Sequence, residues 1–232
     1  MQTKRALISV LIYCTIMALI ILFFYTSAYI KTTTDPIVKP VIIVDPGHGI
    51  PDGGALAKDG TKESELNLKI ANELRKTAIK KGATVIMTRT GRNSLSNSKT
   101  NNKKDDMNKR RKIRDTCKAD LFISIHMNHY SDPKYFGAQV FYNGINPANK
   151  VLAENIQKSL ISVANPENTR TIKEDNSIYI LKGSPVPSVL VECGFLSNDK
   201  ESEMLKSEKY QKTIAKAIYR GIEDYFNKNQ EY

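Results

Sequence analysis

Short apolar runs recur along this chain, and polar or amphipathic stretches separate them. Short continuous apolar runs between turn signals are typical of strands that are buried on both faces of a sheet. The predicted strands lie at residues 41–44, 84–88, 121–125, 138–142, 178–181 and 189–191. The predicted helices lie at residues 62–81 and 105–118, after Asn146-Pro147, and after Ser197-Asn198. This alternation predicts an α/β fold, with a mostly parallel sheet of about six strands flanked by helices on both faces.

The first predicted helix shows its period clearly. Leu66, Ile70 and Leu74 recur at four-residue spacing and share one helix face, and Gly82 follows as a terminator. The polar stretch 93–102 instead predicts an exposed loop. With 232 residues and no visible repeat, the chain is predicted to hold one folded domain with room for a proper core.

The N-terminus carries a longer apolar run, from Ala6 to Ile30, behind the basic pair Lys4-Arg5. Its most apolar part, which ends at Tyr25, approaches the roughly 20 residues that span a bilayer, whereas the apolar region of a secretory signal has only about 7–15 residues. Thr26-Ser27-Ala28 still offers a small-residue cleavage site, so a membrane anchor and a cleaved signal both stay open. Both interpretations place the rest of the chain outside the cytoplasm. A buried core helix is disfavoured by the basic pair at the extreme N-terminus.

These observations divide the chain into four predicted parts. Residues 1–30 form the membrane anchor or signal segment, and residues 31–39 form a polar linker. Residues 40–226 form the folded domain, and residues 227–232 form a short tail.

Positive charge is concentrated in one stretch of the predicted domain. The formal net charge is +11, and ten Lys and Arg against three Asp fall between Arg92 and Lys118. On an exported protein, this excess predicts a surface for anionic polymers such as wall glycans, teichoic acids or phosphate-bearing lipids. The alternative is a solvated loop whose charge only aids solubility. No aromatic residues are interleaved with these charges, and the predicted compartment is wrong for nucleic acid, so no nucleic-acid partner is expected.

The three cysteines, at positions 14, 117 and 193, do not make a disulfide framework. Cys193 lies in an apolar strand, and no His–Asp pair is left over to activate it. It is therefore predicted to be a small buried hydrophobic residue rather than a nucleophile.

Residues that carry chemistry follow three of the predicted strands. His48 follows the first strand, His126 follows the third and Glu192 follows the last, while Glu63 lies in the first turn of the first helix. Ligands of open α/β sheets bind outside the carboxyl ends of the strands. We therefore expect these four side chains to converge at one edge of the sheet.

Two imidazoles and a carboxylate are the usual protein ligands of a hydrolytic zinc, and a further carboxylate is then free to act as a base. Each residue also has a simpler interpretation. His48, in a glycine-flanked loop, is alternatively a surface residue. His126 is alternatively a satisfied core histidine, with His129 as a competing ligand. Glu192 is expected to be nearly buried, which requires compensation from a nearby zinc or from a salt bridge.

Four motifs, in this order, resemble those of the zinc-dependent N-acetylmuramoyl-L-alanine amidases of the Amidase-3 type. They are Asp45-Pro-Gly-His-Gly49, Glu63 with Asn67-Leu68, Ala119-Asp-Leu-Phe-Ile-Ser-Ile-His-Met-Asn128, and Pro187-Ser-Val-Leu-Val-Glu-Cys-Gly-Phe-Leu-Ser-Asn198. The resemblance covers about residues 41–226 and implies a twisted sheet flanked by helices. It implies that His48, Glu63 and His126 bind one catalytic zinc ion and that Glu192 is the catalytic acid and base. Asn128 is predicted to orient the substrate or a ligand, with a turn-forming role as the alternative.

The resemblance also implies a peptidoglycan substrate. The bond cleaved is the amide between the lactyl group of muramic acid and L-Ala of the stem peptide. A single catalytic domain behind an N-terminal apolar segment resembles the small spore-cortex amidases, whose product precedes the cortex muramic lactam. An extracytoplasmic location follows, either membrane-anchored through residues 6–30 or secreted, with the spore cortex as one setting. No wall-binding repeat is visible, so an accessory protein is predicted to aid substrate access or order the site.

Two other functions stay open: a zinc carboxypeptidase-like cell-wall peptidase and a non-catalytic wall-binding protein. The chain also departs from the pattern of the family that it resembles at Ile50-Pro51, Met127 and His129. The lip of the pocket is therefore expected to differ.

Overall fold

The computed structural model describes residues 2–33, 39–96 and 102–229, so part of the predicted linker, of the 93–102 loop and of the tail lies outside the described residues. The chain divides into two compact units, Met1–Lys39 and Pro40–Tyr232. Helix α1 (Gln2–Thr33) makes up most of the described part of the first unit. Among the described residues, no helix is both long enough and apolar enough to cross a membrane.

A six-stranded sheet forms the centre of the second unit, in the order β2-β1-β3-β6-β4-β5. The strands are β1 (Val41–Pro46), β2 (Thr84–Met87), β3 (Leu121–Asn128), β4 (Gln139–Tyr142), β5 (Lys173–Glu174) and β6 (Ser188–Phe195). All neighbouring pairs are parallel except β4 and β6, which are antiparallel. The predicted α/β fold with a mostly parallel sheet is confirmed.

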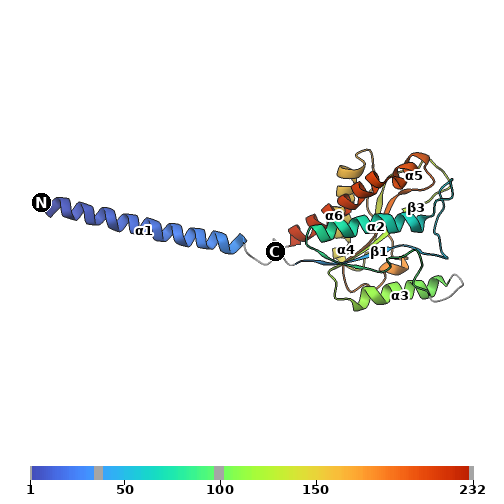
Figure 1. Cartoon of the computed structure of the whole chain (residues 1–232), viewed down its shortest axis with the longest axis horizontal. Helices are drawn as coiled ribbons and strands as arrows, with labels where there is room; N and C mark the ends of the chain where they lie inside the picture. The colour runs from blue at the N-terminus through green and yellow to red at the C-terminus, as the bar shows by residue number, and fades with distance from the viewer. Residues whose placement is uncertain (1, 34–38, 97–101, 230–232) are drawn as a thin grey trace. The chain divides into compact units, whose positions relative to one another are not determined.

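Helices cover both faces of this sheet. One face carries α2 (Glu63–Lys80), α4 (Pro147–Ser159), the short π-helix η1 (Leu160–Ala164) and α6 (Glu208–Asn229), which share one large apolar core with the strands. Helix α5 (Asp199–Lys206) follows β6 and packs beside α6. The other face carries α3 (Lys103–Thr116) and the 3-10 helix η2 (Tyr179–Leu181) over a smaller core. Figure 1 shows α3 on the opposite side of the strands from α2 and α6.

The helix boundaries follow from side chains that satisfy the first backbone N–H groups. Asn102, Asn146 and Asn198 cap α3, α4 and α5 with their side-chain oxygens, and Pro147 occupies the first turn of α4. The apolar stripe predicted for the first helix is fully buried, because Leu66, Ile70 and Leu74 face the large core.

The structure differs from the predicted elements in three places. The apolar run 178–181 was expected to be a strand, but it contains η2, because Arg114 donates hydrogen bonds to the carbonyls of Ile180 and Lys182 that a neighbouring strand would otherwise take up. The last predicted helix is two helices, separated at Ser207. The two-residue strand β5 was missed because it is exposed and has no apolar pattern.

The register of the sheet sets the geometry of the site. Asp45 on β1 is opposite Ser124 on β3, and His126 on β3 is opposite Glu192 on β6. The carboxyl ends of β1, β3 and β6 thus lie at one edge of the sheet, called the carboxyl edge below.

Candidate active site

His48, Glu63 and His126 come together at the carboxyl edge, and we call these three residues the candidate metal group. One ligand atom from each lies within 4.8 Å of the others. The Nε2 atom of His48 is 3.2 Å from Oε2 of Glu63, and Nδ1 of His126 is 3.0 Å from Oε1 of Glu63. The two imidazole rings meet edge to face, with centroids 5.0 Å apart. The predicted convergence of these three residues is therefore present.

Glu63 is held in place by backbone groups from two neighbouring segments. Its Oε1 accepts a hydrogen bond from the N–H of Met127 at 3.1 Å, and its Oε2 accepts one from the N–H of Ala55 at 2.9 Å. Burial favours the neutral acid, but His126 and His48 outweigh it and hold the pKa of Glu63 far below its usual range. Glu63 is thus a carboxylate at neutral pH, as a metal ligand must be.

Two glycines let the segments around the candidate metal group approach closely. A Cβ atom at Gly47 would overlap the ring of His126, and a Cβ atom at Gly54 would overlap Oε2 of Glu63. Gly54 also has a φ of +70°, a left-handed conformation that favours glycine. A side chain at either position would therefore push the three residues apart.

His48 itself has a left-handed backbone, with a φ of +59°. A residue with a side chain stays in this region only when its surroundings hold it there, and such residues cluster at functional sites. Its Nδ1 is 2.9 Å from Oδ2 of Asp52, which also accepts a hydrogen bond from Gly54 through Oδ1. Burial lowers the pKa of His48, but Glu63 and Asp52 outweigh burial and raise it to about 9. Metal binding must displace this proton, so metal affinity is expected to rise with pH.

Two buried arginines hold the loop that carries His48 by hydrogen bonds to its backbone. Arg110 of α3 donates to the carbonyl of Pro46 at 2.6 Å and to that of His48 at 2.5 Å. Arg89 donates to the carbonyls of Pro46 and Gly47, both at 2.9 Å. The backbone of residues 46–48 is therefore held by arginine side chains that lie about 40 and 60 residues later in the chain.

Asp45 balances the charge of Arg110. It is buried and accepts hydrogen bonds from Arg110, Thr88 and Ser124 at 2.6–2.7 Å. Burial raises the pKa of the Asp45 carboxyl, but Arg110 and the two hydroxyls outweigh it, so the pKa lies below its usual value. Arg110 also pairs with Asp106 at 2.8 Å, which makes a buried chain of alternating charges.

The basic stretch 92–118 is therefore only partly a surface. Arg110 and Arg114, which the sequence pattern assigned to that surface or loop, are fully buried and bind backbone carbonyls and carboxylates. The remaining Lys and Arg of α3 are partly or fully exposed. The predicted anionic-polymer surface thus has fewer charges than the sequence count suggests.

Replacing Arg110 with Met is expected to lower the free energy of unfolding by about 3–5 kcal/mol, because it leaves the buried Asp45 without its cationic partner. Urea unfolding followed by circular dichroism measures this loss. Lys112→Met, on an exposed position of the same helix, is the matched control and should change stability by less than about 0.5 kcal/mol. Equal stability of the two variants would contradict a bracing role for Arg110.

Glu192 lies beside the candidate metal group without hydrogen-bonding to it. It is opposite His126 in the register, and among the described residues its buried Oε2 atom has no hydrogen-bond partner. Burial raises the pKa of Glu192 to about 7, with a further increase from the charge of Glu63, although the nearby histidines lower it. The salt bridge that was the alternative explanation is absent from the described residues. Glu192 is half-buried, and an unpaired carboxylate oxygen that is itself buried, with this pKa, fits a group that exchanges protons.

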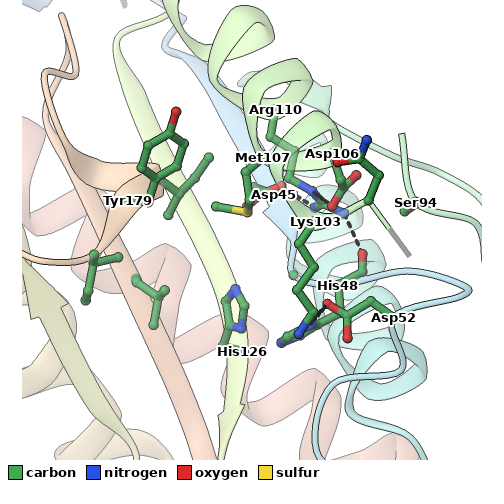
Figure 2. Close-up of a pocket in the computed structure, with 15 residues that line it drawn as sticks. Asp45, His48, Asp52, Ser94, Lys103, Asp106, Met107, Arg110, His126 and Tyr179 are labelled. Atoms are coloured by element: carbon green, nitrogen blue, oxygen red, sulfur yellow. Dashed lines mark hydrogen bonds and ion pairs between the residues drawn. The ribbon is translucent and has the colours of Figure 1, made fainter. Parts of the chain in front are cut away.

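A cavity of about 190 Å³ opens from the candidate metal group toward α3. His48 and Asp52 lie on one side of it, and Met107 and Tyr179 lie across from them (Figure 2). Ile178, Ile180 and Leu190 add apolar surface, and Lys103, at the start of α3, lies 3.5 Å from Asp52.

Asn128 and His129, the remaining predicted or competing site residues, lie just past this group. The side-chain oxygen of Asn128 accepts a hydrogen bond from the N–H of His129 at 2.9 Å, which is the turn-forming alternative for this residue. His129 is exposed and is not part of the candidate metal group. The orienting role of Asn128 therefore stays a prediction.

The second layer of the site was not predicted from the sequence. Asn67 donates hydrogen bonds to Oε1 of Glu63 and to the carbonyl of Gly47, both at 3.2 Å. Its spacing of four residues from Glu63 on one helix was the available signal. Asp52, Arg89 and Arg110 act through the tertiary structure and have no such local signature.

The donor set of the candidate metal group fits a divalent metal such as zinc. Two imidazole nitrogens and one carboxylate oxygen within 4.8 Å match the three protein ligands of hydrolytic zinc sites. Asp52 on Nδ1 of His48 matches the carboxylate that commonly orients a metal-bound histidine. The Oε2 atom of Glu192, beside these three ligands, has no hydrogen-bond partner among the described residues.

Comparison with known proteins agrees with this geometry. Residues 42–224 match the sequence profile of the family described as N-acetylmuramoyl-L-alanine amidase. The germination-specific N-acetylmuramoyl-L-alanine amidase of Bacillus subtilis (strain 168) is 39% identical over 198 residues, which cover 82% of this chain and 81% of that protein. The CwlD amidase from Clostridioides difficile, solved in complex with the GerS lipoprotein, is 41% identical with a TM-score of 0.79. That match covers 82% of this chain and 99% of the CwlD chain.

A second solved structure, an N-acetylmuramoyl-L-alanine amidase from Clostridium difficile 630, is 30% identical with a TM-score of 0.73 and covers 82% of this chain and 97% of its own. The match of the family profile spans more than half of the chain and includes every residue of the candidate metal group and Glu192. This chain belongs to the N-acetylmuramoyl-L-alanine amidase family (Amidase-3).

Proposed function

We propose that this protein is a zinc-dependent amidase that hydrolyses the bond between the lactyl group of muramic acid and L-Ala of the peptidoglycan stem peptide. The observation that carries this proposal is the close grouping of His48, Glu63 and His126 in a member of this family, beside an unpaired Glu192. The three grouped residues are proposed as the zinc ligands. Zinc bound there supplies a Lewis acid that polarises the scissile carbonyl and lowers the pKa of water.

Glu192 is proposed as the acid and base of this reaction. Its carboxylate removes a proton from the attacking water and then delivers it to the nitrogen of the leaving L-Ala. Because Oε2 has no competing donor among the described residues, it is available for this transfer. Burial also raises the pKa of Glu192, which favours a stronger base than an exposed carboxylate, although a bound cation opposes this increase.

The setting that we propose is the spore cortex, outside the cytoplasm. The support is the similarity to the germination-specific amidase of Bacillus subtilis and to CwlD. CwlD was solved with the lipoprotein GerS, and by analogy we propose that an extracytoplasmic accessory protein also binds this chain. The predicted product there is muramic acid without a stem peptide.

Muropeptide analysis tests this function. The purified protein with zinc is incubated with vegetative and cortex peptidoglycan, and the products are identified by mass spectrometry. Intact stem peptides with a free L-Ala amino group are expected. Stems that lose a C-terminal residue would instead indicate a carboxypeptidase, and no released peptide from either substrate would indicate a non-catalytic wall-binding protein.

Removal of the metal is expected to abolish the release of stem peptides. Dialysis against a chelator should leave no measurable activity, and zinc added back in equimolar amount should restore it, because the Lewis acid is essential to the proposed reaction. Melting of the same samples provides a readout besides activity, since zinc should raise the melting temperature of the chelated protein. Full activity at undetectable metal content would contradict zinc dependence.

A further inference from the structure

A group of exposed aromatic side chains lies on the loop between β3 and β4. Tyr130, Tyr135 and Phe136 expose 53%, 38% and 42% of their surface. We call these three residues the aromatic shelf. Large exposed apolar side chains that gather in one place commonly mark interaction sites rather than ordinary surface.

The aromatic shelf is built on a rigid base. The ring of Tyr135 stacks on buried Phe195 at 6.5 Å, and Tyr130 meets Tyr135 edge to face at 4.9 Å. The guanidinium of Arg170 lies 4.5 Å from the ring centre of Phe195 and donates a hydrogen bond of 2.7 Å to the carbonyl of Phe136. These contacts hold the rings in place although much of their surface faces solvent.

Two further hydrogen bonds tie this loop to the segment after β6. The N–H of Tyr130 donates to Ser197 at 3.1 Å, and the side chain of Asn198 donates to the carbonyl of Pro133 at 2.8 Å. The rings therefore need little further ordering when a ligand binds, and a rigid tyrosine gives contact area at low entropic cost.

The aromatic shelf follows the ends of the two strands that carry His126 and Glu192. His126 and Glu192 are opposite each other in the register, and the next paired residues are Asn128 and Phe195, where β3 and β6 end. Tyr130 follows two residues after Asn128, and Phe195 supports Tyr135. None of the shelf residues lines the cavity of about 190 Å³ on the α3 side. Two different surfaces thus lie at this end of the sheet: a small cavity lined by His48 and His126, and an open shelf just past the ends of β3 and β6.

We propose that the aromatic shelf binds sugar rings of the glycan strand while the amide lies at the candidate metal group. This inference rests on the proposed function, in which the scissile amide joins a sugar to a peptide. A long polymer requires an open surface, whereas a cavity of about 190 Å³ admits only a short chain. The C–H faces of sugar rings are apolar and flat, and they pack against aromatic faces while the sugar hydroxyls stay in water.

Binding of glycan strands without stem peptides tests this assignment. Such strands have no scissile amide, so binding can be measured by calorimetry independently of turnover. The double variant Tyr130→Ala, Tyr135→Ala is expected to raise the Kd about tenfold, because two stacked rings are lost. Tyr130→Phe, Tyr135→Phe keeps the rings and should bind nearly as the wild type does. Ile145→Ala removes an apolar side chain that is 81% exposed near the opposite edge of the sheet, and should bind unchanged.

Unchanged glycan binding by the double Ala variant, with an unaltered circular dichroism spectrum and melting temperature, would overturn the proposal. Loss of binding to an accessory lipoprotein but not to glycan would also overturn it, in favour of a protein interface. Cleavage of a soluble muramoyl peptide with a single sugar separates this result from the proposed function. If the wild type releases its peptide while the shelf variants bind glycan normally, the amidase function stands and only the shelf assignment fails.

Discussion

Glu192→Gln is expected to lower kcat/KM for stem-peptide release by about 10²–10⁴-fold while zinc remains bound. The substitution keeps the shape of the side chain but removes the carboxylate that accepts the proton of water. Glu192 makes no hydrogen bond to the candidate metal group in the described structure, so its loss should leave the three ligands in place. Initial rates on peptidoglycan and the zinc content of the purified variant measure the two effects separately.

Glu154→Gln makes the same chemical change at an exposed position of α4 and serves as the matched control. It should retain both activity and zinc. A Glu192→Gln variant with near wild-type rates would show that another group moves the proton. A variant without zinc would show that Glu192 is a ligand rather than a base.

The pH profile of the wild type gives an independent readout of the same residue. Burial raises the pKa of Glu192 to about 7, and a bound cation favours the carboxylate and lowers that pKa. A general base works only when deprotonated, so kcat/KM should fall with decreasing pH along an acid limb at or below about pH 7. At saturating zinc, so that protonation of His48 does not limit metal binding, the residual rate of Glu192→Gln should lack this limb.

Local patterns predicted most of the fold because most of its strands are short apolar runs with helices between them. They failed at segments whose secondary structure depends on tertiary contacts. The apolar run 178–181 was predicted to be a strand, yet Arg114 binds the carbonyls of Ile180 and of Lys182 just beyond it, and Ile180 and Leu181 fill the small core as part of η2. Periodicity alone also cannot show that the last helix is interrupted at Ser207.

The convergence of the candidate metal group was predictable because each residue is attached to an element whose position the parallel sheet dictates. His126 lies in β3 near its carboxyl end, and Glu63 begins the helix that follows β1. Arg110 was not predictable as a brace, since its acceptors are carbonyls more than 60 residues earlier. The aromatic shelf was not predicted for a related reason. Its rings lie on an irregular loop, and the sequence does not show that Tyr135 stacks on Phe195.

Glu63→Ala is expected to abolish both zinc binding and activity. The substitution removes the proposed carboxylate ligand and the acceptor of the Met127 and Ala55 N–H groups, so the segments that carry the two histidines lose their common partner. Loss of second-layer contacts alone lowers metal affinity about 10–100-fold, and removal of a ligand should exceed this range. Competition with a chromophoric chelator measures the zinc affinity directly.

Asp52→Asn provides the graded comparison, because Asp52 orients His48 without belonging to the candidate metal group. It should weaken zinc binding about 10–100-fold and restore activity at high zinc concentration, whereas Glu63→Ala should remain inactive at any zinc concentration. Stoichiometric zinc in Glu63→Ala would remove Glu63 from the ligand set. Together with Glu192→Gln, which should keep zinc and lose turnover, these variants separate the three roles: a ligand, the residue that orients a ligand, and the base.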